Sequence, residues 1–121
     1  MKLNPDCLRG LLLTAEENCT FSHSWIYSSE AAQTLYLAEY DHEEILYHIN
    51  QADKSGLILN VHYYDGGNTV IVSDLSPAGH EFLANIRNDS VWKKVLSKAS
   101  EASLPIIYEV AKRLAAKYFL D

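Results

Sequence analysis

The chain has 121 residues, of which 48% are hydrophobic, and its formal net charge at pH 7 is −6. This length is enough for one globular core and too short for two domains of ordinary size. The first residues lead into a predicted helix, and no apolar run reaches membrane-spanning length, so we expect neither a secretory signal nor a membrane partner. The two cysteines make no disulfide framework, and we expect reduced thiols in a cytoplasmic protein.

The charge is unevenly distributed along the chain. Residues 1–90 contain 4 Lys and Arg against 13 Asp and Glu, whereas residues 91–121 contain 6 against 3. A domain that neutralises nucleic-acid phosphates is expected to be basic where it meets them. The acidic body of this chain therefore weighs against DNA binding through residues 1–90.

A first helix is predicted to begin at Asn4 and Pro5, because Asn is a favoured N-cap and Pro at the first helical position loses no hydrogen bond. We expect it to end near Glu17-Asn18. Residues at helical spacing give it an inner face, extended at either end by the two cysteines: Leu8, Leu11, Leu12, Ala15, Cys7 and Cys19. Buried cysteines are usually inert, so packing is the favoured role for both.

Residues 20–40 carry an aromatic cluster, Phe21, Trp25, Ile26 and Tyr27. Core packing against the first helix is the favoured interpretation, and an exposed binding patch or base-stacking platform is the alternative. Further along, residues 28–30 predict the start of a short helix, and Thr34 to Leu37 are a candidate for a small strand.

A second helix is predicted between Asp41 and Ser55-Gly56. Asp41 and Glu44 have the spacing of a capping box, and Gly56 suits a helix stop. Its apolar stripe consists of Ile45, Ile49 and Ala52 with Leu46 beside them. We expect His48, next to this stripe, to be a hydrogen-bonded core or boundary residue. The opposite, exposed face carries Glu43, Tyr47, Asn50 and Lys54.

A β-hairpin follows over residues 57–64 and 69–75, with Asp65-Gly66-Gly67-Asn68 as its turn. Closing this loop pairs Tyr64 with Thr69, Tyr63 with Val70 and Val61 with Val72. One face then carries Tyr63, Val61, Val70 and Val72, and the other carries His62, Asn60, Thr69 and Ser73. This pattern predicts a hairpin with one face on a core.

Three further helices are predicted. Ser76 and Pro77 begin one with a buried side formed by Phe82, Leu83 and Ile86. Asp89 or Ser90 caps the next, which carries Val91, Trp92, Val95, Leu96 and Ala99. Ser103 opens the last, whose apolar side consists of Leu104, Ile107, Ala111, Leu114 and Tyr118, widened by Ile106 and Val110. A helix this apolar must pack across the rest of the chain or pair with a second copy.

The helix, Ser55-Gly56-Leu57-Ile58, the Gly-rich hairpin and Leu75-Ser76-Pro77-Ala78-Gly79 together resemble a known arrangement. They are similar to winged-helix regulators of the multiple-antibiotic-resistance and phenolic-acid-decarboxylase repressor types. In those proteins the helix before the hairpin reads DNA and the hairpin is the wing. The resemblance implies an α+β fold with a winged helix-turn-helix-like core over residues 1–90 and a C-terminal helical extension over residues 91–121.

A closer resemblance is to the family labelled domain of unknown function 2513, short proteins of bacteria and their prophages. It rests on residues 43–49, 56–58 and 79–83. No activity is assigned to this family, so the resemblance implies no chemistry.

The sequence contains no arrangement typical of catalysis. The histidines His23, His42, His48, His62 and His80 are scattered without metal-ligand spacing. Gly66-Gly67 lie at a hairpin tip rather than between a strand and a helix, so they form no phosphate cradle. Neighbouring carboxylates such as Glu43 and Glu44 lie on solvated helix surface. We expect no enzyme activity, metal or cofactor.

Two binding hypotheses remain. The favoured one is a protein-interaction module, because the acidic start of the second helix would repel phosphates. Its contacts would come from the helix face, Glu43, Tyr47, Asn50, Gln51 and Lys54, and from the wing, Tyr64, Asp65 and Asn68. The alternative is a DNA-binding regulator, dimeric through its C-terminal helix, in which Asn50 and Gln51 read adenine. Its candidate phosphate contacts are Lys93, Lys94, Lys112, Arg113 and Lys117.

Overall fold

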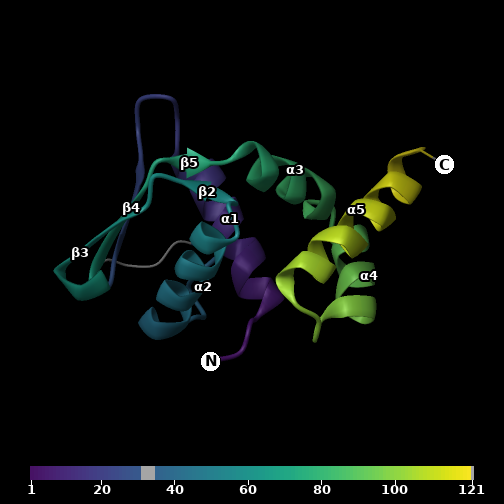
Figure 1. Ribbon diagram of the computed structural model, residues 1–121, viewed down its shortest axis with the longest axis horizontal. Coiled ribbons are helices and arrows are strands. Elements are labelled where there is room, and N and C mark those ends of the chain that lie inside the picture. The colour runs from purple at the N-terminus through teal and green to yellow at the C-terminus, as the bar shows by residue number, and fades with distance from the viewer. Residues whose placement is uncertain (31–34, 121) are drawn as a thin grey trace.

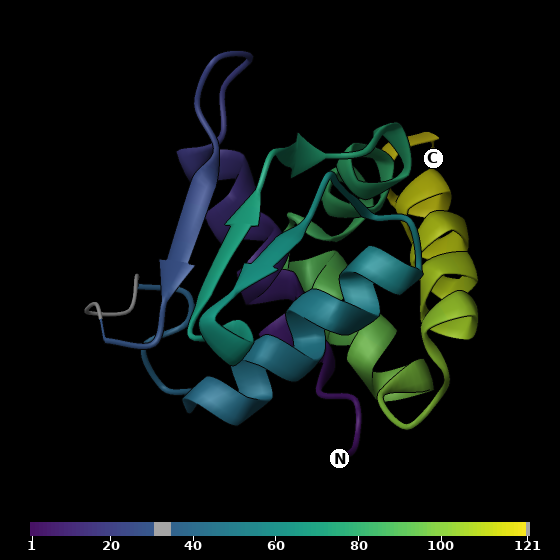
Figure 2. The ribbon, with the colours of Figure 1, turned by 60° about the vertical axis from the view of Figure 1, so that its left-hand side comes forward.

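A computed structural model describes residues 1–30 and 35–120, which form the predicted α+β fold (Figures 1 and 2). In chain order the elements are helix α1 (Pro5–Asn18), strand β1 (Trp25–Ser28), helix α2 (His42–Lys54), strands β2 (Ile58–Leu59) and β3 (His62–Tyr64), the 3-10 turn η1 (Asp65–Gly67), strands β4 (Thr69–Val72) and β5 (Asp74–Leu75), and helices α3 (Pro77–Ile86), α4 (Asp89–Ala99) and α5 (Leu104–Leu120).

Side-chain caps begin the helices where the sequence predicts them. Asn4 accepts from the backbone N–H groups of the first turn of α1, Asp41 accepts from Glu44 N–H at 2.9 Å, and Ser76 accepts from Gly79 N–H at 2.9 Å. The starts predicted for α1, α2 and α3 are therefore confirmed. Helix α4 differs by one position, because the cap is Asn88 rather than Asp89 or Ser90. Its side-chain oxygen reaches the N–H groups of both Ser90 and Val91.

The hairpin has the predicted register. Tyr64 pairs with Thr69 and Tyr63 with Val70 in a three-stranded sheet of order β1–β4–β3. The same register continues in a separate two-stranded sheet, where Ile58 pairs with Leu75. Between the two sheets the ladder is interrupted at residues 60–61. Asn60 has a left-handed φ of 49° there, which turns its strand away from the extended conformation.

The interruption changes one predicted pair. Val61 lies outside every described strand, and Val72 pairs instead with Trp25 of β1. Val70 and Val72 are buried as expected, but Val61 is only partly buried and Tyr63 is exposed. The hairpin thus packs on the core through β4 more than through β3.

The segment before α2 corrects two predictions. The small strand that completes the sheet is Trp25–Ser28, so the assignment of residues 34–37 is wrong for residues 35–37, which form a turn; Thr34 lies outside the described residues. The helix expected to start at residues 28–30 is also absent there, since Ser28 ends β1 and residues 29–30 form a turn. The cause is the alternation of Trp25 and Tyr27, which both point to the core and give the segment the period of a strand.

The aromatic cluster is divided between core and surface. Trp25 and Tyr27 are buried, whereas Phe21 is fully exposed and Ile26 is 62% exposed. Core packing is therefore confirmed for Trp25 and Tyr27, whereas a binding role for the exposed Phe21 and Ile26 stays a prediction.

Helices α4 and α5 cover the body of the chain on one side, next to α3 (Figure 1). Trp92 and Val95 of α4, and Ile107 and Ala111 of α5, belong to the same hydrophobic core as α1 and the sheet. The indole Nε1–H of Trp92 donates to Asp6 at 2.8 Å, which joins α4 to the first turn of α1. The last turns of α5 emerge from this core: Tyr118 is partly exposed, and Leu120 is 83% exposed.

A buried histidine joins α1 to α2. The backbone N–H of Asn4 donates to Nε2 of His48 at 2.8 Å, and Nδ1 of His48 lies 2.7 Å from the carbonyl oxygen of Glu44. Because an amide N–H can only donate and a carbonyl can only accept, the proton must be on Nδ1. His48 is fully buried, so the prediction of a hydrogen-bonded core histidine is confirmed.

This geometry predicts loss of stability in mild acid. Burial lowers the pKa of His48 below its ordinary value, outweighing the opposite effect of the hydrogen bond to Glu44. Below about pH 6.5 the imidazole of His48 takes up a proton in the unfolded chain but not in the folded chain. The free energy of unfolding should therefore decrease as the pH is lowered, by at most about 1.4 kcal/mol per pH unit for one group. Urea unfolding measured between pH 7 and pH 5 tests this.

The matched variants are His48→Gln and His62→Gln, since His62 is exposed. His48→Gln should lose about 1–3 kcal/mol at pH 7 and most of the pH dependence in this window. Arg87 lowers the pKa of Glu16 by hydrogen bonding, so the contribution of Glu16 is lost only below the ordinary range of a glutamate and does not interfere. Equal slopes for wild type and His48→Gln would contradict the assignment.

Candidate functional site between helix α2 and the wing

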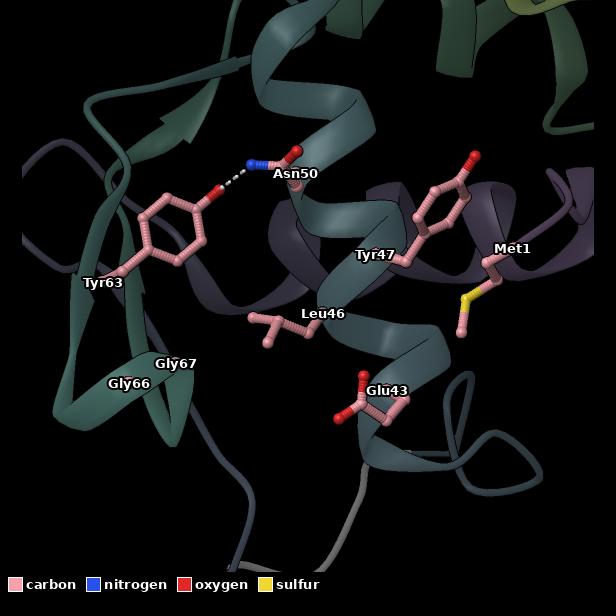
Figure 3. A pocket seen from close by; sticks show the side chains of 8 residues that line it. All are labelled: Met1, Glu43, Leu46, Tyr47, Asn50, Tyr63, Gly66 and Gly67. Atoms are coloured by element: carbon pink, nitrogen blue, oxygen red, sulfur yellow. Dashed lines mark hydrogen bonds between the residues drawn. The ribbon is translucent and has the colours of Figure 1, made fainter.

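An open groove of about 570 Å³ runs over the exposed face of α2 and under the hairpin tip. We call it the α2–wing groove. Its lining residues come from three parts of the chain: Met1, then Glu43, Leu46, Tyr47 and Asn50 of α2, then Tyr63, Gly66 and Gly67 of the hairpin. Figure 3 shows Leu46 and Tyr63 on the wing side of α2, with Tyr47 and Met1 on its other flank.

The wing is held against α2 at two points. The hydroxyl of Tyr63 accepts from Asn50 Nδ2 at 3.3 Å (Figure 3) and donates to Asp53 at 3.4 Å. At the tip, Gly67 approaches Leu46 so closely that a Cβ on Gly67 would lie 2.8 Å from Leu46 Cδ2. Partial burial raises the pKa of Tyr63, so its hydroxyl remains protonated and able to donate at neutral pH.

Strand β1 fixes the other end of α2. The hydroxyl of Tyr27 lies 2.6 Å from Nδ1 of His42, the first residue of the helix, and the two rings are stacked at 5.7 Å. Together with His48, this contact positions α2 from the side opposite the groove. The exposed face of α2 is therefore carried on a helix that is anchored at its start and middle.

Glu43 is the carboxylate among the groove's lining residues, and the stretch of chain that forms the groove is acidic in sequence. Residues 41–68 contain five carboxylates and a single lysine, Lys54; the carboxylates belong to Asp41, Glu43, Glu44, Asp53 and Asp65. In the part of the chain that the structure describes, none of the five forms an ion pair with a lysine or arginine. The apolar and aromatic side chains of Leu46, Tyr47 and Tyr63 line the groove together with Glu43. Such a surface can hold a cation next to an apolar group.

The structure brings together part of the predicted helix face. Glu43, Tyr47 and Asn50 line the groove, as their spacing on one face suggests. Gln51 is partly buried outside the groove lining. Lys54 lines a different hollow of about 550 Å³, which it shares with the start of α5.

The predicted wing residues do not line the groove. Tyr64, Asp65 and Asn68 are exposed, and Asn68 lies toward β1, where its side-chain oxygen accepts from Ser29 at 3.3 Å. The wing residue that reaches α2 is Tyr63. The alternation of side chains along the hairpin predicts that Tyr63 points toward the core. In the folded chain the Tyr63 side chain points toward α2, where its hydroxyl accepts a hydrogen bond from Asn50.

The candidate phosphate contacts lie elsewhere. Lys93 and Lys94 are on α4, and Lys112, Arg113 and Lys117 are on α5, all of them exposed. Figure 1 places α4 and α5 at the opposite end of the molecule from the hairpin tip. Lys94 and Lys117 share a small hollow of about 220 Å³ between the two helices, and Lys112 lies 4.0 Å from Glu81.

The described residues offer little to chemistry. Within residues 1–30 and 35–120, no three histidine, cysteine or acidic side chains are grouped to hold a metal ion. Both cysteines are free, and burial raises the pKa of the Cys7 thiol to about 12. A thiol with such a pKa has almost no thiolate at neutral pH and is a poor nucleophile. None of the described helices is long and apolar enough to cross a membrane.

The chain is thus an α+β protein with an open groove between a helix and a hairpin, lined by aromatic and apolar side chains and by Glu43. The chain belongs to the family described as "Hypothetical protein (DUF2513)", which matches residues 2–105. It is also similar to an uncharacterised protein of Haemophilus influenzae, with 30% identity over 125 residues that cover 97% of this chain and 98% of the relative. No solved structure gives a significant match.

Sequence reasoning did not identify Leu46, Tyr63, Gly66 and Gly67 as groove residues. The turn signal of Gly66-Gly67 was recognised, but nothing local shows that the tip folds back onto α2. That contact requires the whole hairpin to lie along the helix, a consequence of tertiary packing.

The two tip glycines provide a matched test of wing docking. Both have positive φ, 65° for Gly66 and 93° for Gly67, so alanine is strained at either position by about 1–2 kcal/mol. Only at Gly67 would the new Cβ also displace Leu46, because nothing lies within 4 Å at Gly66. Gly67→Ala should therefore be more destabilising than Gly66→Ala in urea unfolding.

A double-mutant cycle identifies the cause of the excess. In a Leu46→Ala background the cost of Gly67→Ala should fall to that of Gly66→Ala, because the clashing methyl group is gone. If the cost of Gly67→Ala is the same in both backgrounds, the tip does not pack on Leu46.

Proposed function

We propose that the protein is a non-catalytic binding module with a winged-helix core, which takes a segment of a partner protein in the α2–wing groove. The segment carries a lysine or arginine beside an apolar side chain. The observation that carries the proposal is a groove in which Glu43, which forms no ion pair within the described residues, lies with the apolar and aromatic side chains of Leu46, Tyr47 and Tyr63. A cytoplasmic location is part of the proposal.

The position of the wing supports a protein partner over DNA. Asn50 is the helix residue best suited to read adenine, yet its amide donates to the hydroxyl of Tyr63. Base readout through Asn50 would require Tyr63 to move away. A protein segment can instead lie over Tyr63 and use its ring as a contact surface.

Charge supports the same choice. A DNA reader approaches phosphates with its recognition helix, and here that helix starts with Asp41 as its cap and Glu43 and Glu44 in its first turn. The same carboxylates attract a lysine or arginine, and the rings of Tyr47 and Tyr63 offer it favourable cation–π contacts. Association steered by such charge is fast and sensitive to salt.

The winged-helix assignment within this proposal rests on element order and pairing. A helix, a small strand paired against a hairpin, and a second helix directly before that hairpin occur in the expected order. In this assignment α2 corresponds to the recognition helix and the β3–β4 hairpin to the wing.

DNA binding is the second candidate function, because exposed basic residues are gathered on α4 and α5: Lys93, Lys94, Lys112, Arg113 and Lys117. They could contact phosphates only through a face of the molecule away from α2. In a dimeric regulator this face would supply backbone contacts without base readout.

Binding to mixed-sequence duplex DNA decides between the candidates. The protein-module proposal predicts no binding in low salt, since the α2 face repels phosphates. Fluorescence anisotropy of a labelled duplex, measured over a salt series, is the assay. Micromolar affinity for the duplex that falls steeply with salt would overturn the proposal and favour the DNA-binding regulator. Loss of that affinity in the Lys94→Glu variant would then place the DNA-binding surface on α4.

The groove itself is tested by a charge reversal with a matched control. Glu43→Lys should lose about tenfold or more in affinity for a captured protein partner, because it removes an attraction and adds a repulsion. Glu17→Lys makes the same change at an exposed position of α1 and should leave affinity unaltered. Biolayer interferometry with partners captured from bacterial lysate gives both values. A partner that binds both variants equally well binds outside the groove.

Tyr47→Ala and Asn50→Ala separate the apolar from the polar contribution of the groove. Tyr47→Ala should weaken binding more, because it removes ring surface, whereas Asn50→Ala releases Tyr63 from one of its two hydrogen bonds. If neither variant changes the affinity of any captured partner, the helix face is not the binding surface.

A further inference from the structure

Helix α5 presents an exposed stripe on the side opposite its buried face. The buried residues are Leu104, Ile107, Ala111 and Ala115. The stripe consists of Ile106, Glu109, Arg113, Lys117 and Leu120, all exposed, with Ile106 at 52% and Leu120 at 83%. Figure 2 shows α5 at the periphery of the molecule, along its right-hand edge. We call these five residues the α5 stripe.

The residues of the α5 stripe are symmetrically spaced about Arg113. Its members are separated by 3, 4, 4 and 3 residues, so they lie on one helix face and the spacing reads the same in both directions from Arg113. The chemical pattern is apolar, acidic, basic, basic, apolar. Reversing the direction therefore places an apolar residue on an apolar one and an acidic residue on a basic one.

We propose that a second copy of this chain occupies the stripe, with the two α5 helices antiparallel about a two-fold axis at Arg113. Ile106 then meets Leu120 of the second copy, and Glu109 meets Lys117 of the second copy. The axis repeats each contact, so two ion pairs and two apolar contacts form from four residues of each chain. This interface is independent of the α2–wing groove and of the function proposed for it.

The charges within one chain support this occupant. Lys112, which precedes Arg113 in the chain but lies outside the stripe, is already 4.0 Å from Glu81 of α3. In contrast, Glu109, Arg113 and Lys117 form no ion pair in the portion of the chain that the structure describes. The antiparallel arrangement supplies partners for two of these three charges. A parallel arrangement would place Glu109 on Glu109 and Lys117 on Lys117, which repel.

Arg113 is the unfavourable contact of the dimer. On the axis it faces Arg113 of the second copy, and two like charges repel even though guanidinium planes can stack. One helix face also provides less than the roughly 800 Å² per partner of a standard interface. The dimer is therefore weak, and it forms and dissociates over the micromolar range.

Sedimentation equilibrium of the full chain gives the first test. The average mass should rise from monomer to dimer between about 10 μM and about 1 mM, and 1 M salt should shift the transition upward. A monomer throughout this range would overturn the proposal.

Charge reversal locates the interface. Glu109→Lys and Lys117→Glu should each weaken dimerisation by about tenfold or more, since each creates two like-charge contacts. The double variant Glu109→Lys/Lys117→Glu restores both ion pairs with exchanged signs and should return to within about threefold of wild type. Lys98→Glu, on an exposed position of α4 outside the stripe, is the control. A double variant as weak as the single ones would show that the two residues do not pair, and overturn the arrangement.

The axis is tested by Arg113→Gln. Removing the like charges that face each other should tighten the dimer, by about threefold to tenfold, whereas Lys112→Gln should not. Circular dichroism checks that each variant is folded. All of these positions are exposed, so we expect the substitutions to leave the fold intact. Weaker dimerisation of Arg113→Gln would contradict an axis at this residue.

Discussion

The hydrogen bond from Asn4 N–H to His48 Nε2 joins two helices that are 44 residues apart in sequence. It satisfies the backbone of the α1 N-cap with a side chain from the middle of α2, inside the core where an unpaired polar group would be costly. The second ring nitrogen is satisfied within α2 itself, by the Glu44 carbonyl. The orientation of α2 therefore depends on one neutral tautomer, and everything presented on its outer face depends on that orientation.

The groove is a consequence of two different kinds of constraint on α2. From the inner side the helix is held by His48, by the contact of His42 with Tyr27, and by burial of Ile45 and Ile49. From the outer side the wing rests on it through Tyr63 and Gly67. A hairpin held in this way is a wall of the groove rather than a free arm. Rigid walls lower the ordering cost of binding, which favours recognition of an extended segment.

What could be predicted from the sequence was set by local physics. Helix caps at Asn4, Asp41 and Ser76 depend on residues within one turn, and the register of Tyr63 with Val70 follows from the loop length. What could not be predicted depends on tertiary packing. Whether residues 25–28 or 34–37 supply the third strand is decided by which side chains the core accepts. Likewise, Tyr63 rather than Tyr64 faces the groove because the hairpin lies along α2.

Charge shows the same difference between sequence and fold. Counted along the sequence, residues 91–121 have more basic than acidic side chains, and this excess suggests one phosphate-binding surface. In the folded chain these residues are divided among three surroundings. Lys112 lies near Glu81 of α3, Lys94 lines the hollow between α4 and α5, and Arg113 stands on the outer stripe with Glu109. Lys117 belongs to the stripe and also borders the hollow. An acidic residue within a basic helix changes the most favourable partner for that helix. A uniformly basic face suits a polyanion, whereas a face with both signs in symmetrical order suits its own copy.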